Sequence, residues 1–209
     1  QEFKWIYVLF IALLFTNSAS AKYPEKTIKI IVPFTAGGAT DIAGRLLAEE
    51  LSKAFNNPVV VENREGAAGV IGVQATTKAA ADGYTLLIAG NTLMTSHKTL
   101  YKNLPYDSLR DLETVSRISA GSHIIVVKAN SNIKDMKDLL RLARAKPGGI
   151  SYGSGGSGTS VHLAAEMFQV QAGVKLLHVP YRGTSLAVTG LMSGDTDLMF
   201  DTTPSAFPK

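Results

Sequence analysis

The sequence predicts an α/β protein built from two similar lobes. From Lys22 onward, apolar runs rich in β-branched residues alternate with amphipathic stretches, as strands and covering helices do along a parallel sheet. The alternation lapses near residues 119–122 and then resumes on the same plan, so we place a lobe boundary there. Hydrophobic residues make up 45% of the 209 residues, enough to bury a sizeable core.

In the first half the pattern predicts two consecutive βαβ units. Strands are expected at 27–32, 59–62 and 84–89, where β-branched and apolar residues cluster. Helices are expected at 41–55 and 69–80. The first of these helices would pack an inner face made of four apolar side chains, Ile42, Leu46, Leu47 and Leu51.

The second half repeats the plan after an irregular stretch around Leu104 and Pro105. The predicted strands span 123–128, 150–153, 174–179 and 197–201, and the predicted helices span 136–145, 159–172 and 185–193. Pro147, Gly148 and Gly149 end the first of these helices. Two such lobes would form a crevice where the carboxyl ends of their strands meet, the usual ligand position in open α/β sheets.

The first residues resemble a secretory signal peptide. An unbroken apolar run at 5–15 follows Lys4 and precedes Ala19, Ser20 and Ala21, which suit a cleavage site. As a helix the run would extend roughly 16 Å, against about 30 Å for a bilayer core, which disfavours a membrane anchor. A buried core helix is the other alternative. We therefore expect a signal peptide at 1–21, a first lobe at 22–120 and a second lobe at 121–209.

The composition narrows the function classes. The chain has no cysteine, so it offers neither a lipid-attachment cysteine nor a disulfide framework. Its net charge of +4 comes from scattered Lys and Arg, without the basic runs and interleaved aromatics of nucleic-acid binding. We expect an exported, unanchored monomer that does not bind nucleic acid.

Three glycine-rich turns each join a predicted strand to a helix, at 33–41 (PFTAGGATD), 64–69 (REGAAG) and 154–160 (SGGSGTS). The first turn of a helix leaves about four amide N–H groups unpaired, and glycines let a ligand approach them. A carboxylate or phosphate is the natural ligand. The hydroxyl and carboxyl groups here have an alternative role as ordinary N-caps, with Thr40 or Asp41 in the first turn and Thr159 or Ser160 in the third.

Other chemistries fit less well. The pattern Gly153-x-Gly155-x-x-Gly158 matches a dinucleotide fingerprint, but the next strand ends in His178 to Tyr181 without the acidic residue that holds a ribose. Thr159 replaces the lysine that a P-loop requires.

Ser154 and Ser157 could serve a hydrolase, yet neither completes G-x-S-x-G. His162 and Glu166 form at most half of a metal site, and His97 and His178 look isolated.

Taken together, the motifs resemble the Bug-type extracytoplasmic solute receptors of tripartite tricarboxylate transporters. The resemblance runs from Tyr23 to Phe207 and includes seven ordered blocks: YPEKTIKIIVPFTAGGATD (23–41), VVVENREGAAGVIG (59–72), DGYTLLIAGN (82–91), LPYD (104–107), YGSGGSGTSVHLAAEMF (152–168), HVPYRG (178–183) and DLMFDTTPSA (197–206). It implies a two-lobed periplasmic-binding-protein fold, or flytrap, whose C-terminal segment crosses back to the first lobe. We expect this chain to end before that crossover.

The resemblance also implies a site and a role. The ligand would lie between the first and third glycine-rich turns, held by backbone amides and water and not by an arginine. The residues carried over are Phe34, Ala36, Gly37, Gly38, Thr40, Asp41, Ala67, Ala68, Asn91, Ser154, Gly155, Gly158, Thr159, Ser160, His162, Tyr181, Gly183 and Asp201. Thr35 and Thr203 stand where proline and asparagine are common in the family.

The expected function is capture of a small organic carboxylate in the periplasm, either a di- or tricarboxylate or an aromatic acid. The receptor would deliver it to membrane permease subunits, without catalysis, cofactor or metal. Two alternatives stay open. One is a secreted serine-type hydrolase, and the other is a ligand-binding adaptor for a membrane sensor kinase.

Overall fold

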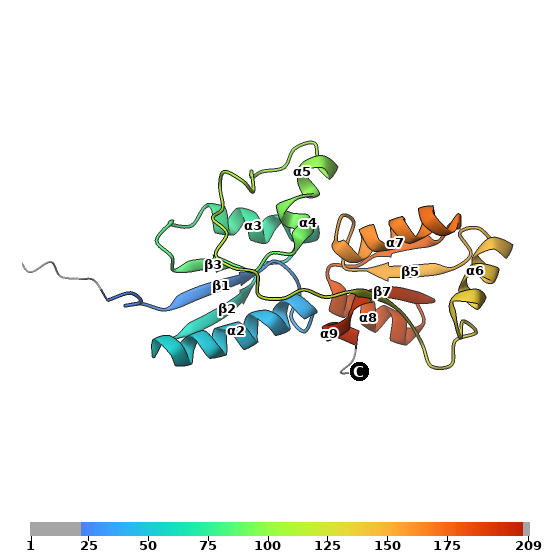
Figure 1. The fold of residues 1–209 in the computed structure, drawn as a ribbon, viewed down its shortest axis with the longest axis horizontal. Helices are drawn as coiled ribbons and strands as arrows, with labels where there is room; N and C mark the ends of the chain where they lie inside the picture. Colours follow the sequence, from blue (N-terminus) through green and yellow to red (C-terminus); the bar gives the residue numbers. More distant parts are fainter. Residues whose placement is uncertain (1–21, 207–209) are drawn as a thin grey trace, which may run out of the picture.

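The computed structural model describes residues 22–206, so the predicted signal peptide at 1–21 lies outside the described residues. The described chain forms two α/β lobes side by side, the first coloured blue to green and the second yellow to red (Figure 1). The segment that joins them, residues 101–122, lies between α5 (His97–Leu100) and β4 (His123–Val127). Within residues 22–206, none of the helices is both long enough and apolar enough to cross a bilayer.

The first lobe contains a three-stranded parallel sheet in the order β2-β1-β3. Its elements are β1 (Ile28–Val32), α2 (Ala39–Phe55), β2 (Val59–Asn63), the 3₁₀ turn η1 (Ala67–Gly69), α3 (Val70–Thr77), β3 (Thr85–Leu87), α4 (Asn91–Met94) and α5 (His97–Leu100). Helix α2 covers one face of β1 through Ala48, while Val73 of α3 lies in the core on the other side. Burial on both faces explains why β1 is almost wholly apolar.

The second lobe contains a four-stranded sheet in the order β4-β7-β5-β6. Its elements are β4 (His123–Val127), α6 (Met136–Ala145), β5 (Ser151–Ser154), α7 (Ser160–Ala172), β6 (Leu177–Pro180), α8 (Thr184–Ser193), β7 (Leu198–Thr202) and α9 (Thr203–Ala206). Tyr152, Leu139 and Leu198 are among its most deeply buried side chains. Strands β5, β6 and β7 run parallel, so their carboxyl ends share one edge of the sheet.

Four expectations need correction. Strand β4 lies at the edge of the second sheet and pairs antiparallel with β7, so this sheet is mixed and not wholly parallel as expected; no local sequence pattern fixes the direction of an edge strand. The predicted helix at 69–80 begins only at Val70, after the 3₁₀ turn, because Gly69 adopts φ 98° and interrupts the helix, and it ends at Thr77. Strand β6 begins only at Leu177. The short helices α4, α5 and α9 were not predicted, because four residues are too few for a helical period to show.

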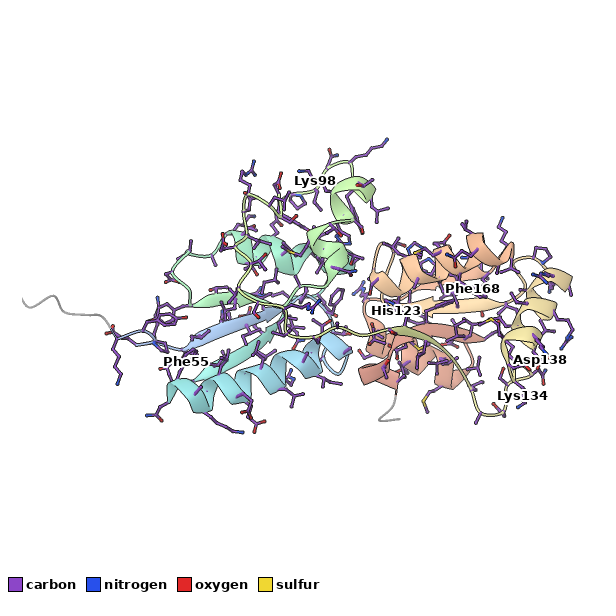
Figure 2. The ribbon with its side chains drawn as sticks, in the orientation of Figure 1. Phe55, Lys98, His123, Lys134, Asp138 and Phe168 are labelled. Carbon is purple, nitrogen blue, oxygen red and sulfur yellow. The ribbon has the colours of Figure 1, made fainter. Side chains whose placement is uncertain are left out.

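The glycine-rich turns of both lobes lie where the two lobes meet. His123, the first residue of β4, lies at the side of the second lobe nearest the first, whereas Lys134 and Asp138 lie at the far side (Figure 2). The turns that follow β1, β2 and β5 all lead toward this junction (Figure 1). The fold therefore brings the three glycine-rich turns of the sequence together between the lobes.

Candidate functional site

A cavity of about 100 Å³ lies between the lobes. One water molecule needs about 10–15 Å³ of such space, so the cavity has room for a small ligand or for several waters. Its described lining consists of Phe34, Gly66, Ala67, Ala68, Gly69, Gly155, Tyr181 and Arg182. Five of these eight residues were expected at the site, and Gly66, Gly69 and Arg182 were not.

The first turn, which leads into α2, is shaped by the carboxylate of Asp41. This side chain is buried and accepts hydrogen bonds from the Gly37 amide and from Arg45 Nε, each at 2.9 Å. Its second oxygen accepts from the side-chain amide of Asn63 at 2.9 Å, and that amide also donates to the Phe34 carbonyl. Asp41 thus ties the turn to β2, on the first lobe, and fixes the backbone beside Phe34.

The charge of Asp41 is maintained by these contacts. Burial alone would raise the pKa of its carboxyl, but the hydrogen bonds from Arg45, Gly37 and Asn63 outweigh burial and hold the pKa below its usual value. The alternative role for Thr40 or Asp41 as the N-cap is wrong, because Gly38 occupies the N-cap of α2 and makes no side-chain capping bond. No side chain at the N-cap therefore covers the amino end of this helix.

The second turn holds two consecutive alanines in the left-handed region. Ala67 has φ 47° and Ala68 has φ 51°, and both line the cavity. Residues other than glycine rarely adopt such angles, and each costs about 1–3 kcal/mol unless the surroundings impose it. Strained backbone of this kind is concentrated at ligand clamps. The turn therefore presents peptide groups to the cavity in an orientation that an ordinary loop would not keep.

The third turn is held from within the second lobe by two buried hydroxyl groups. Ser154 accepts a hydrogen bond from the Gly156 amide at 3.1 Å, and Thr159 donates to the Gly156 carbonyl at 2.7 Å. Thr159 does occupy the N-cap position of α7, but its hydroxyl makes no capping bond. Both side chains instead fix the path of the turn, which places Gly155 in the cavity wall.

Three stacked aromatic rings, those of Tyr152, His178 and His162, lie against the third turn. His178 lies between Tyr152, at a ring separation of 4.8 Å, and His162, at 4.3 Å, so the expectation that His178 is isolated is wrong. His178 Nε2 lies 2.7 Å from the Ser154 hydroxyl, and His162 Nδ1 accepts a hydrogen bond from the Gly158 amide at 3.1 Å. Because Nδ1 accepts, the neutral ring of His162 carries its proton on Nε2.

The protonation of this stack is set by its surroundings. Burial, and then the neighbouring His162, lowers the pKa of His178 to about 4, against a smaller opposing effect of Glu166. Burial also lowers the pKa of His162, and Glu166 again opposes the shift. Both rings are therefore neutral near pH 7, and the hydrogen bond that His162 Nδ1 accepts from the Gly158 amide requires this of His162.

The first lobe also holds the third turn. His97 is fully buried and donates through Nε2 to the Gly158 carbonyl at 3.2 Å, and the Tyr101 hydroxyl donates to the Ser157 carbonyl at 3.0 Å. The His97 and Tyr101 rings are 4.8 Å apart. His97 is therefore not isolated as expected, since it bridges the lobes beside the cavity. His97 begins the short helix α5, and nothing in the local sequence indicates its contact with the second lobe.

The close approach of the lobes also requires Gly183. A Cβ at this position would overlap the hydroxyl of Thr35 in the opposite lobe. The two residues lie beside Arg182 and Phe34, which line the cavity. Gly183 is not part of the described lining. Its role near the site is to let the second lobe approach Thr35 of the first lobe closely.

The remaining predicted residues are not part of the described lining of the cavity. Asp201 is buried in β7, where its Oδ1 accepts from the Thr202 amide, and Asn91 is exposed at the start of α4. The predicted residues outside the described lining are Ala36, Gly37, Gly38, Thr40, Asp41, Asn91, Ser154, Gly158, Thr159, Ser160, His162, Gly183 and Asp201. Several of these, as shown above, fix the turns that do line it.

The arrangement offers little for catalysis. Ser154 approaches His178 as a nucleophilic serine approaches its base, but Ser154 is completely buried and bonded to its own turn. Among residues 22–206, no group of three or more His, Asp or Glu side chains is placed to hold a metal ion. What the described lining offers is the backbone of glycines and alanines, two aromatic residues and one arginine.

Known proteins resemble this chain along most of its length. Residues 43–209 match the family model described as the tripartite tricarboxylate transporter family receptor. The "UPF0065 protein in tcbD-tcbE intergenic region" of Pseudomonas sp. (strain P51) is 40% identical over 200 residues, which cover 93% of this chain and 59% of that protein. The chain thus spans about six-tenths of the length of this relative.

Two solved structures share the fold. One, titled "Structure of a periplasmic transporter", is 39% identical with a TM-score of 0.86, covering 89% of this chain and 62% of its own. The other is an R. palustris protein with adipate, 31% identical with a TM-score of 0.86 and the same coverage of both chains. The similarity confirms the two-lobed periplasmic-binding-protein fold expected from the sequence.

Proposed function

Since the chain belongs to the tripartite tricarboxylate transporter receptor family, we propose that it is a periplasmic receptor for a small organic carboxylate. One observation carries the proposal: backbone from two glycine-rich turns, Gly66 to Gly69 on the first lobe and Gly155 on the second, lines a single cavity between the lobes. Exposed peptide N–H groups near helix amino ends favour an anion. A relative that was solved with adipate supports the choice of carboxylate.

The proposed receptor works by closing its lobes. A ligand that contacts both turns stabilises the closed arrangement by its differential affinity for that state. The closed receptor would then dock on membrane permease subunits, as the family description implies. The lobe limits at 22–120 and 121–209 and the predicted site residues belong to this proposal, as do the periplasmic location and the monomeric state.

The experiment is a thermal-shift screen of the full-length protein against mono-, di- and tricarboxylates, aromatic acids, sugars and nucleotides. A ligand at a hundredfold excess over Kd stabilises by about 2.7 kcal/mol, which raises Tm by several degrees. Carboxylates are expected to give this shift. If only sugars or nucleotides raise Tm, the proposal is wrong.

A cavity-filling variant locates the binding. Ala68→Leu introduces a larger side chain at the cavity wall, and because leucine is not β-branched it strains the left-handed backbone at this position less than valine or isoleucine would. This variant should lose the carboxylate-induced shift. Ala54→Leu, on the exposed side of α2, makes the same change away from the cavity and should keep the shift. Equal shifts in both variants would place the carboxylate elsewhere.

A further inference from the structure

Arg182 lines the cavity and is the only charged residue in its described lining. We infer that Arg182 binds a second carboxylate of the ligand, so that the receptor selects dicarboxylates over monocarboxylates. This inference rests on the proposed function and assigns Arg182 as a specificity-determining residue of its site. The sequence analysis did not expect an arginine at the site.

The backbone of Arg182 is held on both sides. The amide of Tyr181 donates to the Ser154 carbonyl at 2.9 Å, and the Tyr181 ring packs so closely on α8 that a Cβ on Gly190 would overlap it. On the other side, Gly183 lies directly against Thr35 of the first lobe. Arg182 therefore occupies a fixed position at the cavity wall.

The side chain of Arg182, in contrast, is exposed and unpaired. Within the part of the chain that the structure describes, no Asp or Glu forms an ion pair with it. Other arginines have such partners, for example Arg45 with Asp41 and Arg141 with Asp138. A guanidinium remains charged at every physiological pH and binds carboxylates through two parallel N–H donors. Its natural partner in the cavity is an anionic group of the ligand.

The position of Arg182 argues for a separate carboxylate. Arg182 follows β6 and belongs to the second lobe, while the strained Ala67 and Ala68 lie on the first lobe. The rest of the described lining is glycine, alanine and two aromatic rings, which suits an uncharged hydrocarbon segment between two polar ends. A ligand with a carboxylate at each end would contact both lobes and draw them together. A monocarboxylate could satisfy only one set of donors.

The test compares adipate with hexanoate, which has the same carbon number and only one carboxylate. Binding of both acids to the full-length protein is measured by calorimetry for the parent and for Arg182→Gln. Adipate affinity is expected to fall at least tenfold, while hexanoate affinity changes less than threefold. Arg182→Lys, which keeps the charge and loses the paired donors, should fall between the parent and Arg182→Gln for adipate.

Arg144→Gln is the matched control, because it removes the same charge from α6 at the far end of the second lobe (Figure 1). It should leave both affinities unchanged. If Arg182→Gln weakens both acids equally, or neither, the inference is overturned while the carboxylate receptor stands. If the parent binds no carboxylate at all, the proposed function itself fails. A melting curve for each variant verifies that exposed Arg182 is not needed for folding.

Discussion

The hydroxyl oxygen of Thr35 lies 2.7 Å from the hydroxyl oxygen of Ser185, and this hydrogen bond joins the two lobes beside the cavity. Thr35 belongs to the turn after β1, and Ser185 to the first turn of α8. Thr35 also lies against Gly183, one residue before α8 begins. A proline, which the resemblance leads us to expect at this position in other members of the family, has no hydroxyl and could not form this bond. Thr35, Ser185 and Gly183 therefore form one of the close contacts between the lobes, in addition to those of His97 and Tyr101 with the third turn.

Replacing Gly183 by alanine is expected to push the lobes apart, because the added Cβ would overlap the Thr35 hydroxyl, and it also strains the backbone, because alanine rarely adopts the φ of 157° found here. Carboxylate affinity should fall at least about tenfold, which corresponds to about 1.4 kcal/mol. Calorimetric titration measures the loss. Gly121→Ala is the control, since a Cβ there would meet no atom within 4 Å. Adding Thr35→Ala to Gly183→Ala should restore part of the affinity; failure to do so would show that the overlap is not the cause.

Ser154→Ala is expected to destabilise the second lobe. The change leaves the buried Gly156 amide and His178 Nε2 without their partner, at a cost of about 1–3 kcal/mol. Urea denaturation measures the loss of unfolding free energy. Ser157→Ala is the matched control, because Ser157 is exposed and contributes only its carbonyl to the contact with Tyr101. It should change stability by less than about 0.5 kcal/mol. Equal effects at the two positions would contradict the role given to Ser154.

Asp41→Asn is expected to loosen the first glycine-rich turn. Asparagine cannot accept from Gly37, Arg45 and Asn63 as a carboxylate does, so the unfolding free energy should fall by about 1–3 kcal/mol. Because the folded-state pKa of Asp41 lies below its ordinary value, its contribution is present at neutral pH and is lost as the pH falls through that lowered value. The stability difference between parent and variant should therefore narrow in acid.

Glu49→Gln on the same helix serves as its control. Glu49 pairs with Lys53 at the surface, where solvent weakens such pairs, so this variant should lose much less stability than Asp41→Asn. A loss as large as that of Asp41→Asn would mean that general charge on α2, and not the turn, is responsible.

The stack of Tyr152, His178 and His162 predicts that the second lobe becomes less stable as the pH falls. The pKa of His178 is about 4 in the folded protein, below the ordinary value of 6.5, so the unfolded chain binds a proton first as the pH falls. Stability from the neutral ring is complete above pH 6.5 and is lost progressively down to about pH 4. His178→Phe keeps a ring between Tyr152 and His162 and removes this titration. Its Tm should be lower at pH 7 but should decline less steeply below pH 6.5; parallel profiles would refute the assignment.

Much of the fold could be predicted because the local signals are strong. Helix α6 begins and ends where the sequence indicated, since Asp135 caps it by accepting from the Asp138 amide and Pro147 follows it. The direction of β4 could not be predicted, because pairing depends on where β7 inserts in the sheet and not on any local pattern. The same holds for α4 and α5, whose place is set by packing.

The candidate site was predictable to the level of its turns. Glycine spacing located the backbone that lines the cavity, but side-chain roles depended on contacts distant in sequence, such as His97 with Gly158 and Asp41 with Asn63. Arg182 did carry a signal that was overlooked. It directly follows Tyr181 beyond the carboxyl end of β6, and that edge of a parallel sheet is where ligands are usually bound.

The most direct test of the account is a crystal structure of the full-length protein with the carboxylate that gives the largest thermal shift. The account predicts ligand density in the cavity between Ala68 of the first lobe and Gly155 of the second, with one carboxylate facing backbone amides of the turns. Ligand density outside this cavity, or a carboxylate held without any contact to the glycine-rich turns, would contradict it.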